Sequence, residues 1–355
     1  MNRLVIIGNG FDLAHGLKTS YQNFINWYWN QWGIRLINSH TDKEQDVFCI
    51  FNVLDSDFNY KIGNDSFYDL LHAVPPSEAV VRAKSDNLYA MRFKYTSHLF
   101  ERINQSIETK GWVDIENEYY HLLIIDEARL SSYQVLNNHL DILREKLIEY
   151  LQTLEYSQVQ MVSSINGKIY RRIEKGELSI NYSYLTEEEL SPSNIMLLNF
   201  NYTKTPEMYL TGGTSINYIH GRLDNPKSVI FGYGDELDED YKRLRNLNDN
   251  ECLRHVKSIR YLEEGNYRRM LEFIQSGPFQ VCIMGHSCGN SDRTLLNTLF
   301  EHPNCVSIKP YYYQKPDGTD NYIELVQNIS RNFNDMKLMR DRVVCKPNTE
   351  PLVNK

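Results

Sequence analysis

The chain opens with a short apolar segment that ends in a glycine-rich loop. Residues 3–7 read Arg-Leu-Val-Ile-Ile, and Gly8-Asn9-Gly10 follows at once. Because the apolar residues are consecutive rather than alternating, the segment is typical of a strand covered on both faces, as in a parallel α/β sheet. The aromatic-rich residues 24–32 then have roughly helical spacing. This order of strand, glycine loop and helix predicts an α/β fold.

The middle of the chain predicts a helical insertion. No proline occurs between Pro76 and Pro192. Within that stretch, Leu, Ile, Tyr and Met recur at the spacing of an amphipathic helix. The helical segments are residues 87–107, 115–125 and 135–156. Segments typical of strands return afterwards, at residues 195–200, 216–219, 229–231, 281–284 and 306–308.

We therefore predict a Rossmann-like parallel sheet formed by residues 1–76 and 191–340, with residues 77–190 inserted as a helical subdomain. A helix is expected at residues 322–333, and the polar C-terminal tail, residues 341–355, is expected to be loosely held. Ligands of such folds lie at the carboxyl ends of the strands.

The composition fits a compact protein that does not coat nucleic acid. The 355 residues are 41% hydrophobic, and the net charge of −8 gives no basic footprint. The six cysteines form no Cys-x-x-Cys pair, so we expect free thiols in a reducing cytosol and no metal site. The first apolar run is too short for a secretion signal or a membrane span. A cytoplasmic protein without membrane contact is the expectation.

The residues after the first strand are candidates for nucleotide binding. Glycines at Gly8 and Gly10 would let backbone N–H groups turn toward a phosphate. Asp12 would then point at a ribose hydroxyl or orient the loop. An ordinary turn with Asp12 as a helix N-cap explains the same residues equally well.

Polar residues also follow the next two predicted strands. Asn201 lies in the segment Asn-Phe-Asn-Tyr-Thr that ends at Thr203, where side chains would reach a sugar, although Asn-rich turns need no function. His220 ends another apolar strand and would serve as a general base, with Gly221 leaving room for a ligand. A lone histidine here is structural as often as catalytic.

Three further segments carry glycine or acidic residues. Residues 231–236 end a predicted strand in glycines and acids, and the acidic run 235–240 favours a solvated helix start over a metal site. In residues 285–289, Gly285 and Ser287 would bracket a phosphate or ribose, and the spacing also fits the Gly-x-Ser-x-Gly pattern of hydrolases. Asp292 stands near the following helix. In residues 112–116, which begin at Trp112, the acids Asp114 and Glu116 favour a helix N-terminus.

In their joint order these segments closely resemble the bacteriophage abortive infection AbiH family. The resemblance rests on residues 4–17, 112–116, 199–203, 219–221, 231–236 and 285–292. It implies a bacterial phage-defence protein, which is a biological role rather than a reaction.

The same order resembles, more remotely, the sirtuin-like fold of NAD-consuming defence proteins. The matching positions are Gly8 with Gly10, Asn201, His220 with Gly221, Phe231 with Gly232, and Gly285 with Ser287. Departures are Phe11-Asp12 in place of small residues, Thr203 where an aspartate is usual, and the missing zinc-binding cysteines of deacylating sirtuins. The resemblance therefore implies cleavage of NAD rather than deacylation.

By this resemblance, NAD is the substrate or ligand, and His220 and Asn201 are catalytic. The residues expected to bind the nucleotide are Gly8, Asn9, Gly10, Asp12, Thr203, Gly221, Gly285, Ser287 and Asp292. Since loss of NAD is toxic, we expect the insertion or a homo-oligomer contact to restrain the activity, and a phage-derived trigger to release it.

Three other functions stay open. A sensor would bind a nucleotide or a phage protein without turnover. A nuclease would use Asp12, Asp114, Glu116 and Asp292 as metal ligands. A serine hydrolase would use Ser287 with His220 or His286, although no acid and histidine follow the pattern in the order known for that fold.

Overall fold

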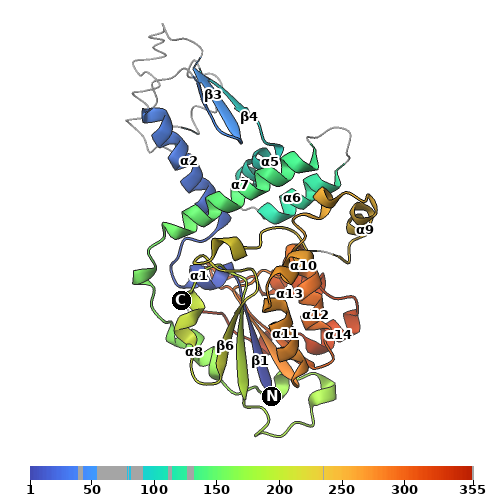
Figure 1. Ribbon diagram of the computed structural model, residues 1–355. Coiled ribbons are helices and arrows are strands. Elements are labelled where there is room, and N and C mark those ends of the chain that lie inside the picture. Colours follow the sequence, from blue (N-terminus) through green and yellow to red (C-terminus); the bar gives the residue numbers. More distant parts are fainter. Residues whose placement is uncertain are drawn as a thin grey trace. The chain divides into compact units, whose positions relative to one another are not determined.

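The computed structural model describes residues 1–38, 43–53, 78, 80, 91–110, 114–125, 132–234 and 236–353 (Figure 1). The chain divides into two compact units, one made of Met1–Thr19 with Leu154–Lys355 and the other of Ser20–Thr153. These bounds differ from the predicted domains. The second unit begins earlier than residue 77, and residues 154–190 belong to the unit that holds the large sheet.

The first unit is built on a five-stranded sheet in the order β6-β5-β1-β7-β8. All four ladders are parallel. The chain winds outward from β1 through β5 to β6, crosses back over β1, and continues through β7 to β8. The strands are β1 (Asn2–Ile7), β5 (Asn194–Asn199), β6 (Thr214–Tyr218), β7 (Phe279–Met284) and β8 (Cys305–Tyr311). This order confirms the predicted parallel sheet and is compatible with a Rossmann-like fold, in which the direction of winding reverses between β1 and β7.

Helices cover both faces of the sheet (Figure 1). On one face, Leu4 and Ile6 of β1 pack in a core that includes side chains of α11 (Asn266–Gln275), α12 (Arg293–Phe300) and α13 (Tyr322–Ser330). On the other, Val5 and Ile7 pack with α1 (Asn9–Ala14) and α8 (Ser163–Tyr170). Burial on both sides explains why this strand needs consecutive apolar residues.

The predicted strand at residues 229–231 is wrong. The segment has no place in the sheet; Ile230 N–H donates to the His220 carbonyl at 2.9 Å, and an isolated bridge joins Tyr233 to Val256. The run is apolar because its side chains are buried in the protein core. Short apolar runs do not distinguish such a segment from a strand.

The C-terminal tail is bound rather than loose. After α14 (Met336–Arg342), Leu352 is 5% exposed, and its N–H donates to the Tyr312 carbonyl at 2.8 Å. The Lys168 ammonium donates to the Leu352 carbonyl at 3.0 Å. The expectation of a loosely held tail fails because the polar residues flank an apolar anchor.

The described part of the second unit combines helices with a small antiparallel sheet. The helices are α2 (Tyr21–Asn38), α5 (His98–Lys110), α6 (Ile115–Ile124) and α7 (Tyr133–Gln152), and the strands are β2 (Lys43–Gln45), β3 (Cys49–Val53) and β4 (Met91–Tyr95). The helical prediction for residues 91–95 is therefore wrong. Phe93 pairs across the ladder with Phe51, their ring centroids 4.8 Å apart, and such cross-strand aromatic pairs stabilise strands.

The remaining helices α9 (Glu239–Asn246) and α10 (Lys257–Arg260) belong to the first unit. None of the helices that the structure describes has the length and apolar character needed to cross a membrane.

Candidate functional site

The carboxyl ends of the parallel strands bring together most of the segments that the sequence singles out. The loop after β5 reaches the loop after β1, because Asn201 Nδ2 donates to the Gly8 carbonyl at 2.9 Å. The loop after β7 reaches it from the other side, since Gly10 N–H donates to the Gly285 carbonyl at 2.8 Å. Three predicted segments therefore meet at the carboxyl ends of β5, β1 and β7, where the winding of the chain through the sheet changes direction.

The glycines allow these loops to touch. A Cβ atom on Gly8 would lie 2.5 Å from the His286 Cα. Gly285 has φ of +77°, and a Cβ there would lie 2.1 Å from the Phe11 nitrogen. The N–H groups of Gly8 and Gly10 already donate to the carbonyls of Met284 and Gly285, at 3.3 and 2.8 Å. A phosphate at this place would rely on other donors.

His220 lies at the centre of a buried polar cluster. It follows β6, is 4% exposed, and its Nε2 lies 3.2 Å from Asp292 Oδ1 and 3.1 Å from the Tyr261 hydroxyl. Nothing in the described part of the chain hydrogen-bonds Nδ1 of His220. The carboxylate thus orients the ring and leaves one nitrogen to accept a proton, which is how a general base is held in many active sites.

Asp292 joins the rest of the cluster. It precedes α12 as the N-cap residue, but its side chain does not cap the helix. Instead the Lys257 ammonium donates to Oδ1 at 2.8 Å, and His286 Nε2 lies 3.5 Å from Oδ2. His286 Nδ1 accepts from the Cys288 N–H at 3.0 Å, which fixes the proton of that ring on Nε2.

An aromatic ring packs against both histidines. The Phe200 ring centroid lies 5.0 Å from that of His220 and 4.3 Å from that of His286, both in edge-to-face arrangements. Phe200 directly precedes Asn201, so the strand end that carries the predicted asparagine is packed on the cluster.

The electrostatics of the cluster favour a neutral base beside a charged carboxylate. Burial lowers the pKa of His220, and the nearby Lys257 ammonium lowers it further. Burial alone would raise the pKa of Asp292, but the Lys257 charge and the hydrogen bonds of His220 and His286 hold this pKa well below its usual range. At neutral pH, His220 is therefore uncharged and able to take a proton.

The loop after β5 is ordered by Asn199, a buried residue that the sequence analysis did not single out. Its Nδ2 donates to the Thr203 carbonyl at 3.0 Å, and its Oδ1 accepts from the Asn201 N–H at 3.1 Å. The Asn201 side chain keeps its Oδ1 without a partner among the described residues. That oxygen is an acceptor for a hydroxyl or a water.

Asp12 is a buried carboxyl rather than a helix cap. Helix α1 has Gly8 at its N-cap, so the alternative of Asp12 as N-cap is wrong. Asp12 is 1% exposed and accepts from the Thr203 hydroxyl at 2.8 and 3.0 Å. Burial raises its pKa to about 6, although the hydrogen bonds from Thr205 and Thr203 lower it.

The neighbouring Asn9 also contacts the protein itself: its Oδ1 accepts from the Thr19 hydroxyl at 2.5 Å.

Two residues that were predicted to bind the nucleotide, Gly221 and Ser287, make contacts within the protein. Gly221 has φ of +81°, and a Cβ there would lie 2.0 Å from the Ser228 carbonyl oxygen, so backbone fills the space beside it. Ser287 is exposed, and its carbonyl accepts from Asn328 Nδ2 at 2.9 Å. No hydrogen bond joins its hydroxyl to either histidine in the region described, so the geometry of a serine hydrolase is not assembled.

The acids of the nuclease alternative have other partners. Asp114 is the N-cap of α6, where it accepts from the Asn117 N–H at 3.0 Å. Glu116 is buried in the first turn of that helix. Trp112 and Asp235 lie outside the described residues. Within the described ranges, no group of three or more His, Cys, Asp or Glu side chains forms a metal site.

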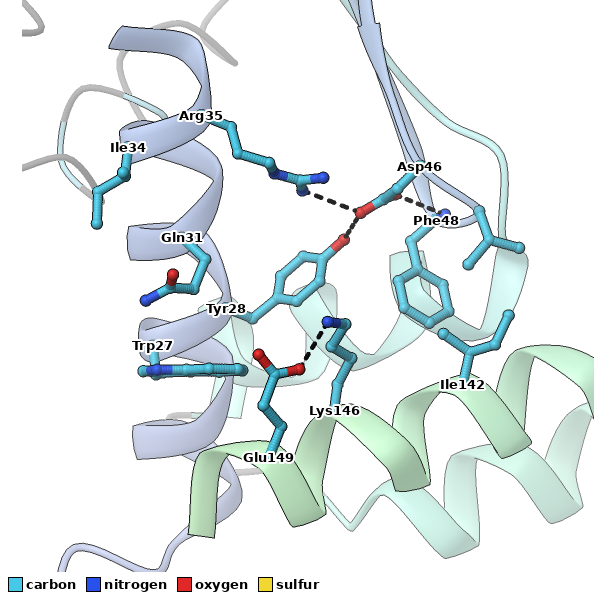
Figure 2. Close-up of a pocket in the computed structure, with 11 residues that line it drawn as sticks. Trp27, Tyr28, Gln31, Ile34, Arg35, Asp46, Phe48, Ile142, Lys146 and Glu149 are labelled. Carbon is cyan, nitrogen blue, oxygen red and sulfur yellow. Dashed lines mark hydrogen bonds and ion pairs between the residues drawn. The ribbon is translucent and has the colours of Figure 1, made fainter. Parts of the chain in front are cut away.

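The second unit holds a separate pocket of about 260 Å³ (Figure 2). Trp27 and Gln31 of α2 face Lys146 and Glu149 of α7 across it. Its charges are paired within the pocket: Arg35 with Asp46 at 3.2 Å, and Lys146 with Glu149 at 2.7 Å. The lining thus favours no class of ligand.

Comparison with known proteins gives one family. A family model described as bacteriophage abortive infection AbiH matches residues 4–313. No curated protein and no solved structure matches the chain.

Proposed function

Because the chain belongs to the bacteriophage abortive infection AbiH family, we propose that it acts in phage defence by hydrolysing the nicotinamide–ribose bond of NAD or a related nucleotide. The observation that carries the proposal is the His220–Asp292 pair at the carboxyl end of a Rossmann-like sheet. Nucleotides bind at this edge in folds of this class. The sirtuin-like resemblance of the motif order supplies the reaction.

In the proposed reaction, water replaces nicotinamide at the anomeric carbon. The bond between that carbon and the pyridinium nitrogen breaks, and its electron pair goes to the ring, which leaves as neutral nicotinamide. Nδ1 of His220 takes a proton from the attacking water or from a ribose hydroxyl and later returns it to solvent. Asn201 Oδ1 positions the water or the ribose.

In this proposal, the remaining predicted residues surround or support the bound nucleotide. Gly8, Gly10 and Gly285 let the loops after β1 and β7 approach each other beneath the nucleotide. The proposal assigns the hydroxyl of the exposed Ser287 to the diphosphate. The loops are held in position by contacts of Asn9, Asp12, Thr203 and Gly221 within the protein. Asp292 acts on the His220 ring. Control by a phage-derived trigger and by self-association belongs to the same proposal.

The test is a time course of NAD with purified protein, analysed by chromatography. Wild type is expected to release nicotinamide, and His220→Ala and Asn201→Ala are expected to abolish the release. His302→Gln is the matched control, since His302 precedes β8 and its Nδ1 accepts from the Asn304 N–H at 3.1 Å, outside the cluster.

The possible outcomes separate the functions. NAD that binds by calorimetry but is not cleaved would favour the sensor. If the wild-type protein is folded by circular dichroism but neither binds nor cleaves NAD, the proposal of a nucleotide site is overturned.

A further inference from the structure

The lysine of the buried cluster comes from a segment that no sequence motif marks. Lys257 is the first residue of α10 and is completely buried. Its ammonium donates to Asp292 Oδ1 at 2.8 Å, the same oxygen that lies 3.2 Å from His220 Nε2. One carboxylate oxygen therefore joins the lysine to the histidine.

Residues 231–234 of the glycine motif contact the segment that carries this lysine. Tyr233 N–H donates to the His255 carbonyl at 3.0 Å, and Lys257 N–H donates to the Tyr233 carbonyl at 2.9 Å. On the opposite side, Thr294 N–H donates to the Gly234 carbonyl at 3.1 Å. The motif thus lies between the lysine segment and the start of α12, which begins directly after Asp292.

The approach of these segments requires the glycines. A Cβ on Gly232 would lie 2.0 Å from the His255 carbonyl oxygen. A Cβ on Gly234 would lie 3.2 Å from the Lys257 Cβ and 3.3 Å from the Ser291 carbonyl oxygen. The motif that the sequence analysis associated with a strand end therefore holds Lys257 against Asp292.

The cluster needs this positive charge. Asp292 is buried, and an ionised carboxylate in such a place is costly unless a cation compensates it. His220 and His286 give Asp292 hydrogen bonds, but as neutral rings they give no charge. The Lys257 ammonium supplies it, and the ionised Asp292 then accepts the Nε2 proton of His220.

We propose that Lys257 is a positioning residue that acts through Asp292 to hold the proton of His220 on Nε2, leaving Nδ1 as the base. The lysine does not touch the substrate. The assignment of Nδ1 as the catalytic base rests on the proposed function, whereas the effect of Lys257 on the His220 ring does not.

The other titratable groups around Asp292 determine what loss of the lysine does. His286 accepts from the Cys288 N–H at Nδ1, Tyr261 contacts His220, and burial raises the pKa of the Cys288 thiol. None of these carries a positive charge in place of Lys257. Without the lysine, Asp292 draws its compensating charge from a protonated His220, because His286 Nδ1 already accepts from the Cys288 N–H.

The experiment is ¹⁵N NMR of the histidine rings of the full chain in wild type and Lys257→Met, with His220 assigned from a His220→Gln spectrum. The pKa of His220 is expected to rise by about one to three units in Lys257→Met. The matched control is Lys309→Met, which removes a buried lysine bonded to Glu177 at 2.5 Å, outside the histidine cluster. An unchanged His220 titration in a folded Lys257→Met protein would overturn the proposal.

A second measurement serves if Lys257→Met does not fold. Wild-type His220 must be neutral, with its proton on Nε2, at pH 7. A charged ring, or a proton on Nδ1, would contradict the proposal without any variant.

Activity separates the two proposals. In an active enzyme, Lys257→Met shifts the acidic limb of kcat/KM to higher pH. If the ring behaves as expected but no nicotinamide is released, the positioning role stands and the proposed reaction fails.

Discussion

Gly8 and His286 approach so closely that a Cβ atom on Gly8 would lie 2.5 Å from the His286 Cα. This contact ties the loop after the central strand to the loop that carries the second histidine and leads to Asp292. Gly8→Ala must therefore displace backbone, and we expect it to destabilise the protein by about 1–3 kcal/mol, as overpacking does.

Thermal unfolding tests this prediction against Gly167→Ala. Gly167 lies within α8, where a Cβ meets nothing within 4 Å, so alanine there is expected to be neutral or stabilising. Equal melting temperatures for Gly8→Ala and wild type would contradict the close contact.

Asp12→Asn is expected to stabilise the protein in a pH-dependent way. Because burial raises the folded-state pKa of Asp12 from 3.8 to about 6, its contribution to stability is present at low pH and is lost as the pH rises through 6. Asparagine lacks the charge, and so the gain should reach about 3 kcal/mol at pH 8 and fall to about half of that at pH 5.

Denaturant unfolding across this pH range measures the effect. Asp317→Asn is the control, since Asp317 is exposed and accepts from Thr319, and it should give no such gain. A stability difference for Asp12→Asn that does not vary with pH would contradict a raised pKa. A buried carboxyl that lowers stability at neutral pH is typical of functional sites.

Glu177 compensates two cations in the first unit. Its carboxylate accepts from Lys309 at 2.5 Å and from Arg171 at 2.8 Å, and its side chain is completely buried. Glu177→Gln leaves the buried Lys309 without its counter-ion, whereas Arg171 keeps Glu350 at 2.7 Å, and we expect a loss of about 3–5 kcal/mol. The exposed Glu187, which pairs with Arg172 at 3.4 Å, provides the comparison: Glu187→Gln should cost under about 1 kcal/mol. Similar losses for both variants in chemical unfolding would be the contrary result.

Asp46 organises the pocket of the second unit. It accepts from the Tyr28 hydroxyl and from the Phe48 N–H at 2.8 Å (Figure 2). It also accepts from Trp32 Nε1 at 3.0 Å. Asp46→Ala leaves the Tyr28 hydroxyl and the Phe48 N–H without this acceptor, at about 1–3 kcal/mol each, whereas Trp32 Nε1 keeps the Tyr28 hydroxyl at 2.8 Å. Hydrogen exchange should therefore accelerate in α2 and β3, and Glu149→Ala, which removes an exposed carboxylate, should leave exchange unchanged. Protection that is equal in the two variants would show that Asp46 is dispensable.

The strands of the sheet were predictable where burial on both faces demands consecutive apolar residues. This holds for β1 and β7, whose residues are all buried. The strand β4 was missed because Met91 and Tyr95 also fit the i, i+4 spacing of the helix predicted around them, although Met91, Phe93 and Tyr95 alternate as in a strand that pairs with β3. The bound tail was missed because its buried apolar residues, Val344 and Leu352, are separated by polar ones.

The sequence singled out two residues of the candidate site, His220 and Asp292, but not the contacts that join them to the rest of the cluster. His220 and Asp292 stand out because each follows a strand, and parallel strands bring such residues to one edge. Lys257 has no such mark, since its role comes from a contact with a residue 35 positions away. The glycines were assigned to phosphate binding, whereas the contacts described here are between loops.

The central claim is that Asp292 makes His220 a base, and the rate of nicotinamide release by Asp292→Asn tests it most directly. An asparagine has no carboxylate to keep the proton of the His220 ring on Nε2. We therefore predict a fall in this rate of about 10²–10⁴-fold with NAD binding retained. Release by a folded Asp292→Asn protein at the wild-type rate would contradict the account.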